Sequence, residues 1–193
     1  SKTKTLIAYI KKYVTADMHV HFHNDFGLAA ANALAAYEAG ARAIDVSING
    51  LGERSGVAAL AEVCMALKRL YGVNNIWDLK LLPELSAMVS RFTRSPIEYS
   101  RPIVGRNVFS HKGGIHSASV MKNPETYEPF PPEILGTYRT IVISKLIGRQ
   151  GLEGVLRSDG KLDVTYLVKR LKRNGSKEFT DKEIDKMMRI YQN

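Results

Sequence analysis

Residues 18–72 repeat one order of elements: a strand pattern, a short polar turn and then a helix pattern. The expected strands are 18–23 and 43–48, and the expected helices are 28–39 and about 58–70. Asn24 and Asp25 separate the first strand from its helix and are good N-cap residues, while Gly40 and Gly72 end the helices. Because strand and helix alternate with short connections, this segment predicts a parallel α/β unit.

Beyond residue 75 the alternation stops, and helix patterns and loops follow. We expect helices over 5–14 and 81–92, a loop over 95–108, a short helix within 110–121, an extended or turned Pro-rich segment over 124–136, a strand over 140–144, and helices near 149–157, 164–174 and 180–191. The sequence thus predicts an α/β domain over 1–75, followed by a linker and a mostly helical subdomain over 76–193.

The composition argues against several classes of protein. One Cys in 193 residues excludes a disulfide framework and a multi-Cys zinc module, and suits a reducing cytoplasm. No apolar run approaches the ~20 residues that cross a bilayer, and no signal-peptide pattern is present, so we expect a cytoplasmic protein without membrane contact. The net charge is +9, but the basic residues are spread along the chain with acidic residues between them. This distribution favours anionic small molecules over nucleic acid as partners.

Three of the five histidines lie in the first expected strand, at positions 19, 21 and 23. Residues two apart on a strand share a face, so His21 and His23 project side by side at its carboxyl end, where parallel α/β folds keep their active sites. Two neutral imidazoles so placed can chelate one divalent ion, and His19 is a possible third ligand. The alternative is a set of solvated or core histidines. If the pair binds metal, we expect a carboxylate from elsewhere to complete the site.

A Gly-rich segment, Asn49-Gly50-Leu51-Gly52-Glu53-Arg54-Ser55-Gly56, follows the second expected strand. Its glycines allow the backbone to approach a ligand or a neighbouring strand closely. Glu53 and Arg54 can orient a metal ligand or bind an anion. An ordinary strand-to-helix loop explains the same segment, and its spacing is neither a dinucleotide-binding nor a Walker fingerprint.

The other two histidines, His111 and His116, flank Lys112 and a Gly-Gly turn. A histidine in such a loop suits general acid–base catalysis, and a surface loop with incidental histidines is the alternative. Tyr127 lies in a Pro-bracketed stretch and, taken alone, is interpreted as a packing aromatic. Cys64 lies within an expected helix and is interpreted as a core residue, not a nucleophile.

Together, four segments resemble the metal-dependent TIM-barrel synthases that condense acetyl-CoA with a 2-oxo acid, namely the isopropylmalate, citramalate and homocitrate synthases. His-Phe-His-Asn-Asp resembles the strand-seven metal motif of this family, and Gly-Leu-Gly-Glu-Arg-Ser-Gly resembles its strand-eight motif. Phe-Ser-His-Lys-Gly-Gly-Ile-His and Asn-Pro-Glu-Thr-Tyr-Glu resemble motifs of its accessory domain. The resemblance implies the last two βα units of a TIM barrel, followed by an α-rich accessory subdomain.

The same resemblance implies roles for individual residues. His21 and His23 would hold a divalent ion such as Zn, Mg or Mn, and His116 and Tyr127 match catalytic positions. The residues expected to orient the metal ligands or bind substrate are Asn24, Asp25, Glu53 and Arg54. In this family the accessory-domain residues reach the active site of the partner subunit, so the resemblance implies a homodimer with accessory-domain exchange.

Within the family the likeness is greatest to homocitrate synthases, through Ala-Arg-Ala-Ile-Asp-Val-Ser, Gly-Glu-Arg-Ser-Gly-Val and His-Lys-Gly-Gly-Ile-His. It implies an acyltransferase of lysine biosynthesis that joins acetyl-CoA to 2-oxoglutarate and gives homocitrate and CoA. The alternatives are an isopropylmalate or citramalate synthase, or a non-catalytic half-barrel subunit that needs an N-terminal partner. Because a barrel needs eight strands and ~250 residues, we expect this chain to be a C-terminal part that is inactive alone.

Overall fold

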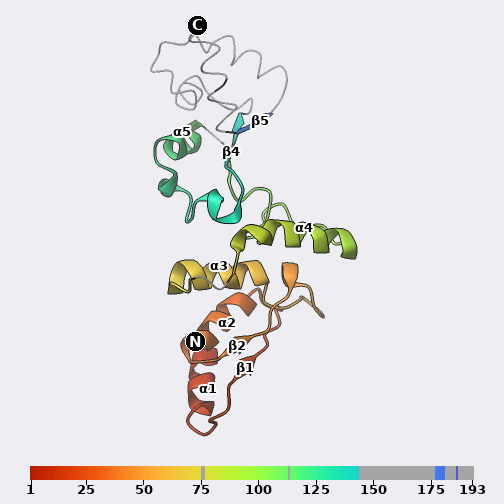
Figure 1. Ribbon diagram of the computed structural model, residues 1–193, viewed down its shortest axis with the longest axis vertical. Helices are drawn as coiled ribbons and strands as arrows, with labels where there is room; N and C mark the ends of the chain where they lie inside the picture. Colours follow the sequence, from red (N-terminus) through yellow and green to blue (C-terminus); the bar gives the residue numbers. More distant parts are fainter. Residues whose placement is uncertain (75–76, 113, 144–176, 181–185, 187–193) are drawn as a thin grey trace. The chain divides into compact units, whose positions relative to one another are not determined.

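The structure, a computed structural model, describes residues 1–74, 77–112, 114–143, 177–180 and 186 (Figure 1). It divides into two compact units, Ser1–Gly105 and Arg106–Asn193. The helices expected near 149–157 and 164–174, and nearly all of the one expected over 180–191, lie outside the described residues. Among the described helices, none has the length and apolar character needed to cross a bilayer.

The first unit contains a pair of parallel strands and the helices that pack around them. Its elements are α1 (Lys2–Ile10), β1 (His19–Val20), α2 (Ala29–Glu38), β2 (Ala43–Ile44), η1 (Ile48–Gly50), α3 (Leu60–Tyr71), η2 (Leu79–Leu81) and α4 (Leu82–Thr93). In the pairing of β1 with β2, His19 lies opposite Ala43 and Val20 lies opposite Ile44. The predicted parallel α/β unit is therefore confirmed.

Both strands are shorter than the sequence pattern predicts, because another segment enters between their carboxyl ends. The Ala58 amide donates to the Phe22 carbonyl at 3.2 Å, and the Ser47 amide donates to the Ala58 carbonyl at 3.1 Å. Isolated bridges join His23 to Val57 and Ser47 to Ala59. The chain around Ala58 thus takes the hydrogen bonds that β1 and β2 would otherwise have continued to exchange with each other.

The core of the first unit is built on a face of small residues in α2. Ala29, Ala33 and Ala36 recur at helical spacing and are at most 1% exposed. Because alanine side chains are short, α2 can lie close to the strands and to both flanking helices. Ile7 of α1 packs in the cluster that contains Ala36, and Val63 of α3 packs in the cluster that contains Ala29 and Ala33.

The two ends of α2 are closed by residues outside the helix. Asn24 Oδ1 accepts a hydrogen bond of 3.0 Å from the Ala29 amide, so the cap predicted at Asn24 acts from upstream of the helix. At the other end Gly40 has a φ of 91°, which suits glycine, and Lys11 Nζ donates to its carbonyl oxygen at 2.9 Å. Gly72, with a left-handed φ of 68°, ends α3 as predicted.

The first unit continues past residue 75 because α4 and the segment after it pack on the earlier elements. Asn49 Nδ2 in η1 donates to the Ser86 carbonyl of α4 at 3.0 Å, and the Ser86 hydroxyl donates to Asn49 Oδ1. Further along, Arg101 forms an ion pair of 3.2 Å with Glu62 in the first turn of α3. The compact unit therefore ends at Gly105, whereas the division at residue 75, which the change of sequence pattern predicts, stays a prediction.

The described part of the second unit contains a mixed three-stranded sheet of order β3-β4-β5. Its elements are β3 (Ser110–Lys112), α5 (Gly114–Lys122), η3 (Pro124–Thr126), η4 (Pro132–Leu135), β4 (Thr140–Ile143) and β5 (Lys177–Thr180). β3 pairs with β4 in parallel and β4 with β5 antiparallel. The sequence predicted β4 and the helix α5, but it gave no sign of β3 or β5, which are short and lack an alternating pattern.

Candidate functional site

A cleft of about 450 Å³ lies at the carboxyl ends of β1 and β2. Its lining residues are His21, His23, Asp45, Val46, Ser47, Leu51, Gly52, Glu53 and Val57. This is the end of parallel strands at which α/β proteins place their active sites. The cleft therefore brings together His21, His23 and Glu53, three of the residues that the sequence analysis selects.

The two cleft histidines lie next to each other. Their ring centroids are 5.0 Å apart, with the ring planes at 69°. His21 Nδ1 lies 3.4 Å from Asp45 Oδ2. His23 Nδ1 is buried and has no hydrogen-bond partner among the described residues. A buried imidazole nitrogen without a partner suits a metal ligand, because coordination would satisfy its lone pair.

These donors fit a divalent ion as part of a ligand set. Neutral imidazole and carboxylate are ligands of Zn²⁺ and of several other divalent ions. In the part of the chain that the structure describes, no group of three or more His, Cys, Asp or Glu side chains is placed to hold a metal. His19 is exposed on β1 and does not line the cleft. A complete site thus needs a ligand beyond His21 and His23, as the sequence analysis expects.

Asn24, Asp25 and Arg54 brace the loops beside the cleft instead of lining it. Besides capping α2, Asn24 donates from its amide to the Gly56 carbonyl at 2.9 Å. Arg54 donates from Nε and Nη2 to the two carboxylate oxygens of Asp25, at 3.1 and 3.0 Å. The hydrogen bond from Arg54 lowers the pKa of Asp25 below its ordinary value. The contacts join the His-containing segment to the Gly-rich segment.

The Gly-rich segment needs glycine for steric reasons at Gly56. Its φ is 81°, and a Cβ there would lie 2.0 Å from the Gly50 carbonyl oxygen. That oxygen also accepts a hydrogen bond of 3.0 Å from the Val57 amide. The sequence predicts that a glycine here allows close approach of the backbone. This is confirmed at Gly56, whose backbone lies against the backbone of Gly50 in the same loop. The resulting tight loop holds Glu53 at the edge of the cleft.

In the second unit the structure brings His116 and Tyr127 together. His116 lies on α5 and Tyr127 directly follows η3. Their ring centroids are 4.7 Å apart, with an angle of 32° between the ring planes. Both side chains are exposed, Tyr127 by 45%. Tyr127 is thus not a core aromatic, and the pair is accessible to a ligand on the surface of its unit.

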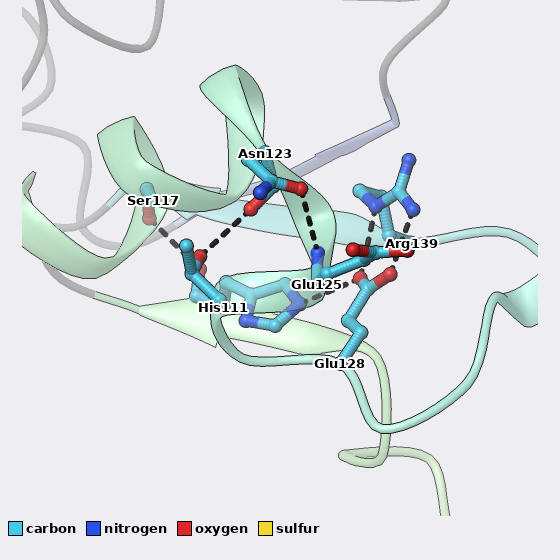
Figure 2. Close-up of polar contacts among 7 residues, drawn as sticks. His111, Ser117, Asn123, Glu125, Glu128 and Arg139 are labelled. Carbon is cyan, nitrogen blue, oxygen red and sulfur yellow. Dashed lines mark hydrogen bonds and ion pairs between the residues drawn. The ribbon is translucent and has the colours of Figure 1, made fainter.

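His111 does not share this surface but belongs to a buried cluster that the sequence analysis missed (Figure 2). Its Nε2 lies 2.9 Å from Glu128 Oε1, and Arg139 donates to both carboxylate oxygens of Glu128 at 2.9 and 2.7 Å. The Glu128 side chain is 2% exposed. Burial pushes the pKa of Glu128 up, but the hydrogen bonds from Arg139 and His111 together outweigh burial and leave the pKa below its ordinary value.

The missed residues are Asp45, Glu128 and Arg139. Glu128 contacts partners 17 and 11 residues away in the sequence, separations that no local spacing rule relates. One weak signal was present, because Glu128 lies two residues before the buried Phe130, and an acidic residue among core residues needs a partner. Asp45 comes directly after β2, just as His21 comes directly after β1. Because the two strands are parallel, this shared position places both residues at the same end of the sheet, and the sequence pattern could have indicated it.

Comparison with known proteins gives the same order of two domains. Residues 1–89 match the HMGL-like family, whose TIM-barrel-related α/β fold the first unit shares, and residues 103–184 match the homocitrate synthase post-HMGL domain-like family. The 2-isopropylmalate synthase of Methanocaldococcus jannaschii is 42% identical over 93% of this chain and 37% of its own length. The homocitrate synthase AksA of Methanopyrus kandleri is 41% identical over 96% of this chain and 48% of its own.

A third relative, homocitrate synthase 1 of a Nostoc species, is 45% identical over 82% of this chain and 41% of its own length. The chain thus spans less than half the length of each of these three relatives. The two matched domains follow one another along the chain, and the identity to these relatives extends over most of it. The chain therefore contains an HMGL-like domain followed by a homocitrate synthase post-HMGL domain, and it is similar over most of its length to proteins named homocitrate synthase and 2-isopropylmalate synthase.

Proposed function

We propose that this chain is the C-terminal part of an acyltransferase that joins acetyl-CoA to a 2-oxo acid. The observation that carries the proposal is the cleft at the carboxyl ends of β1 and β2, where His21 and His23 lie side by side and a buried nitrogen of His23 has no partner in the part of the chain that the structure describes. Similarity to synthases along both units supports it. In such a reaction the acetyl methyl carbon attacks the oxo carbon of the acceptor, and water then cleaves the thioester to release CoA.

His21 and His23 would hold a divalent ion, which supplies a Lewis acid for the oxo group of the acceptor. The chain's own contribution begins with orientation of these two ligands. Asp45 lies beside Nδ1 of His21. A proton held on Nδ1 by this carboxylate would leave the lone pair of Nε2 free to bind the ion. Glu53, at the edge of the cleft, would help to orient the ligands of that ion.

His116 and Tyr127 would transfer protons at the thioester. An imidazole and a phenol whose rings are 4.7 Å apart can exchange a proton with a bound ligand and with each other through water. We propose that this pair acts in the cleft of a partner subunit, in a homodimer that exchanges accessory domains. A base outside the described residues would remove the proton from the acetyl methyl group.

The acceptor that we propose is 2-oxoglutarate, so that the product is homocitrate. A second candidate, the 2-oxo acid used by 2-isopropylmalate synthases, is favoured by the relatives of that name, which reach 42 to 48% identity. Homocitrate synthases among the relatives lie at 40 to 45%. The choice between acceptors therefore needs a direct assay.

A chimera tests the proposal. The N-terminal part of the Methanopyrus AksA protein that precedes the matched region is joined to residues 1–193 of this chain, and CoA release from acetyl-CoA is measured with 2-oxoglutarate or 2-oxoisovalerate. We expect metal-dependent CoA release, greater with 2-oxoglutarate. Preference for 2-oxoisovalerate would select the second candidate.

The control is the same chimera with His21→Ala, which should fold but release no CoA. A folded parent chimera that binds metal and releases CoA with neither acceptor contradicts the proposed function.

A further inference from the structure

A buried ionic cluster occupies the second unit and plays no part in the chemistry proposed above. Glu128 is 2% exposed and both of its carboxylate oxygens are paired, Oε1 with His111 Nε2 and Arg139 Nε, Oε2 with Arg139 Nη2. His111 and Arg139 are themselves 11% and 14% exposed. A buried carboxylate is tolerated only with such partners, so these three side chains are restricted to one arrangement.

The cluster connects segments that are distant in the sequence. His111 lies on β3, Glu128 follows η3 and Arg139 precedes β4. A fourth segment joins through Ser117 of α5, a fully buried residue whose hydroxyl donates to the His111 carbonyl at 3.4 Å. Figure 2 shows these side chains meeting from the helix, the strand and the loops around them.

Two members of this network are the direct sequence neighbours of the exposed His116–Tyr127 pair. His116 precedes Ser117, and Tyr127 precedes Glu128. The amides of Tyr127 and Glu128 both donate to the Pro124 carbonyl, at 3.1 and 2.9 Å. Because the two rings are exposed, the surrounding core does not hold them, and the distance between them depends on the backbone to which they are attached.

We propose that Glu128, together with His111 and Arg139, is a positioning unit that holds Tyr127 against His116. The carboxylate fixes the backbone directly after Tyr127, and the His111–Ser117 contact fixes the backbone directly after His116. The catalytic meaning of the pair rests on the proposed function, whereas the positioning is a property of the folded chain. None of the three cluster residues needs to touch a substrate.

The experiment measures the His116–Tyr127 contact without any catalysis. A ring 4.7 Å away shifts the proton resonances of the His116 ring, so the 193-residue chain is prepared with carbon-13-labelled histidine and its five ring signals are recorded by NMR. His116→Gln assigns the signal, and Tyr127→Leu gives its position without the neighbouring ring. In Glu128→Ala we expect the His116 signal to move most of the way to the Tyr127→Leu position.

The matched control is Glu125→Ala, which removes an acidic side chain from η3, three residues before Glu128, without touching the cluster. It should leave the His116 signal in place. Arg139→Lys keeps the charge but cannot pair with both carboxylate oxygens, so it should give an intermediate shift. A folded Glu128→Ala protein with an unmoved His116 signal overturns the proposal.

If Glu128→Ala does not fold, His111→Leu decides, because it removes the hydrogen bond from position 111 to Glu128 and leaves the Glu128–Arg139 pair intact. A shift in that folded variant supports the positioning role, and an unmoved signal overturns it. Failure of the proposed function would appear elsewhere, as an active chimera carrying His116→Ala or as a parent chimera without CoA release. The two failures are therefore distinguishable.

Discussion

At the scale of single residues, the three histidines of the first segment differ in environment although they alternate along one strand pattern. His21 and His23 line the cleft, and His23 has a buried nitrogen without a partner among the described residues. His19 is exposed and sits where β1 pairs with β2. Equal spacing in the sequence therefore does not give equal access to a ligand, because β1 ends at Val20 and the chain turns toward Val57.

The first prediction concerns metal affinity. In the chimera, His21→Ala or His23→Ala should weaken binding of Mn²⁺ or Zn²⁺ by at least ~10-fold, since each change removes a ligand. His19→Ala is the matched control and should bind as the parent does. Isothermal titration gives the affinities, and circular dichroism checks folding. Equal losses at all three positions would mean that the segment is structural or that His19 is a ligand.

The second prediction concerns acid stability. Glu128 has a pKa lowered in the folded chain relative to about 4.3 in an unfolded chain. Its ionisation therefore stabilises the fold above the unfolded pKa, and this contribution is lost as pH falls through the folded pKa. Glu128→Gln should make the free energy of unfolding depend less on pH below about 5. Urea unfolding at several pH values measures this. An unchanged slope, or an equal effect of Glu125→Gln, contradicts it.

At the scale of elements, the helices are the best-predicted part of the fold. Apolar residues at helical spacing gave α2, α3 and α4 to within two residues of their observed ends. The lengths of the strands were overestimated, because alternation indicates an extended segment but does not say what it pairs with. Beyond β1 and β2 the two segments do not pair with each other, since both form hydrogen bonds with the chain around Ala58. The His111–Glu128–Arg139 cluster was missed for a related reason, since its contacts depend on how separate segments meet.

The third prediction concerns the Gly-rich loop. Gly56→Ala should destabilise the first unit, because its Cβ would collide with the Gly50 carbonyl oxygen and its φ is positive. Gly27→Ala is a matched control, with a φ of 71° and nothing within 4 Å of the added Cβ. It should carry only the backbone strain, about 1–3 kcal/mol. Urea unfolding compares the two variants. Equal destabilisation would show that the contact with Gly50 relaxes freely.

At the scale of the whole molecule, the first unit presents large apolar side chains to solvent. Phe26 is 91% exposed and Phe92 is 82% exposed, and Leu70 and Tyr13 are also largely uncovered. Its sheet has two strands in the described residues, far fewer than the eight of a closed barrel. Burial of each such side chain contributes roughly 1.5–3 kcal/mol. If the chain is part of a barrel, as proposed above, further strands and helices would cover these surfaces.

The fourth prediction follows from these surfaces. The 193-residue chain on its own should self-associate at low micromolar concentration, because a second copy can cover part of the exposed apolar area. Sedimentation velocity measures the association, and Phe26→Ser with Phe92→Ser should weaken it. In the chimera, where we propose that the N-terminal part completes the barrel, this region should be buried and should need no such contact. A monomer that melts cooperatively contradicts the prediction.

The ion pair between Arg101 and Glu62 determines where a polypeptide that contains only the first unit should end. The HMGL-like match ends at residue 89, yet the folded unit continues to Gly105. A polypeptide that ends at residue 89 would retain the hydrogen bond between Asn49 and Ser86 but would lack Arg101, the ion-pair partner of Glu62. Recombinant expression of the first unit by itself should therefore run through Gly105, and shorter versions should be cleaved faster by trypsin after Arg54, which precedes α3, and after Lys68 and Arg69 in its last turn.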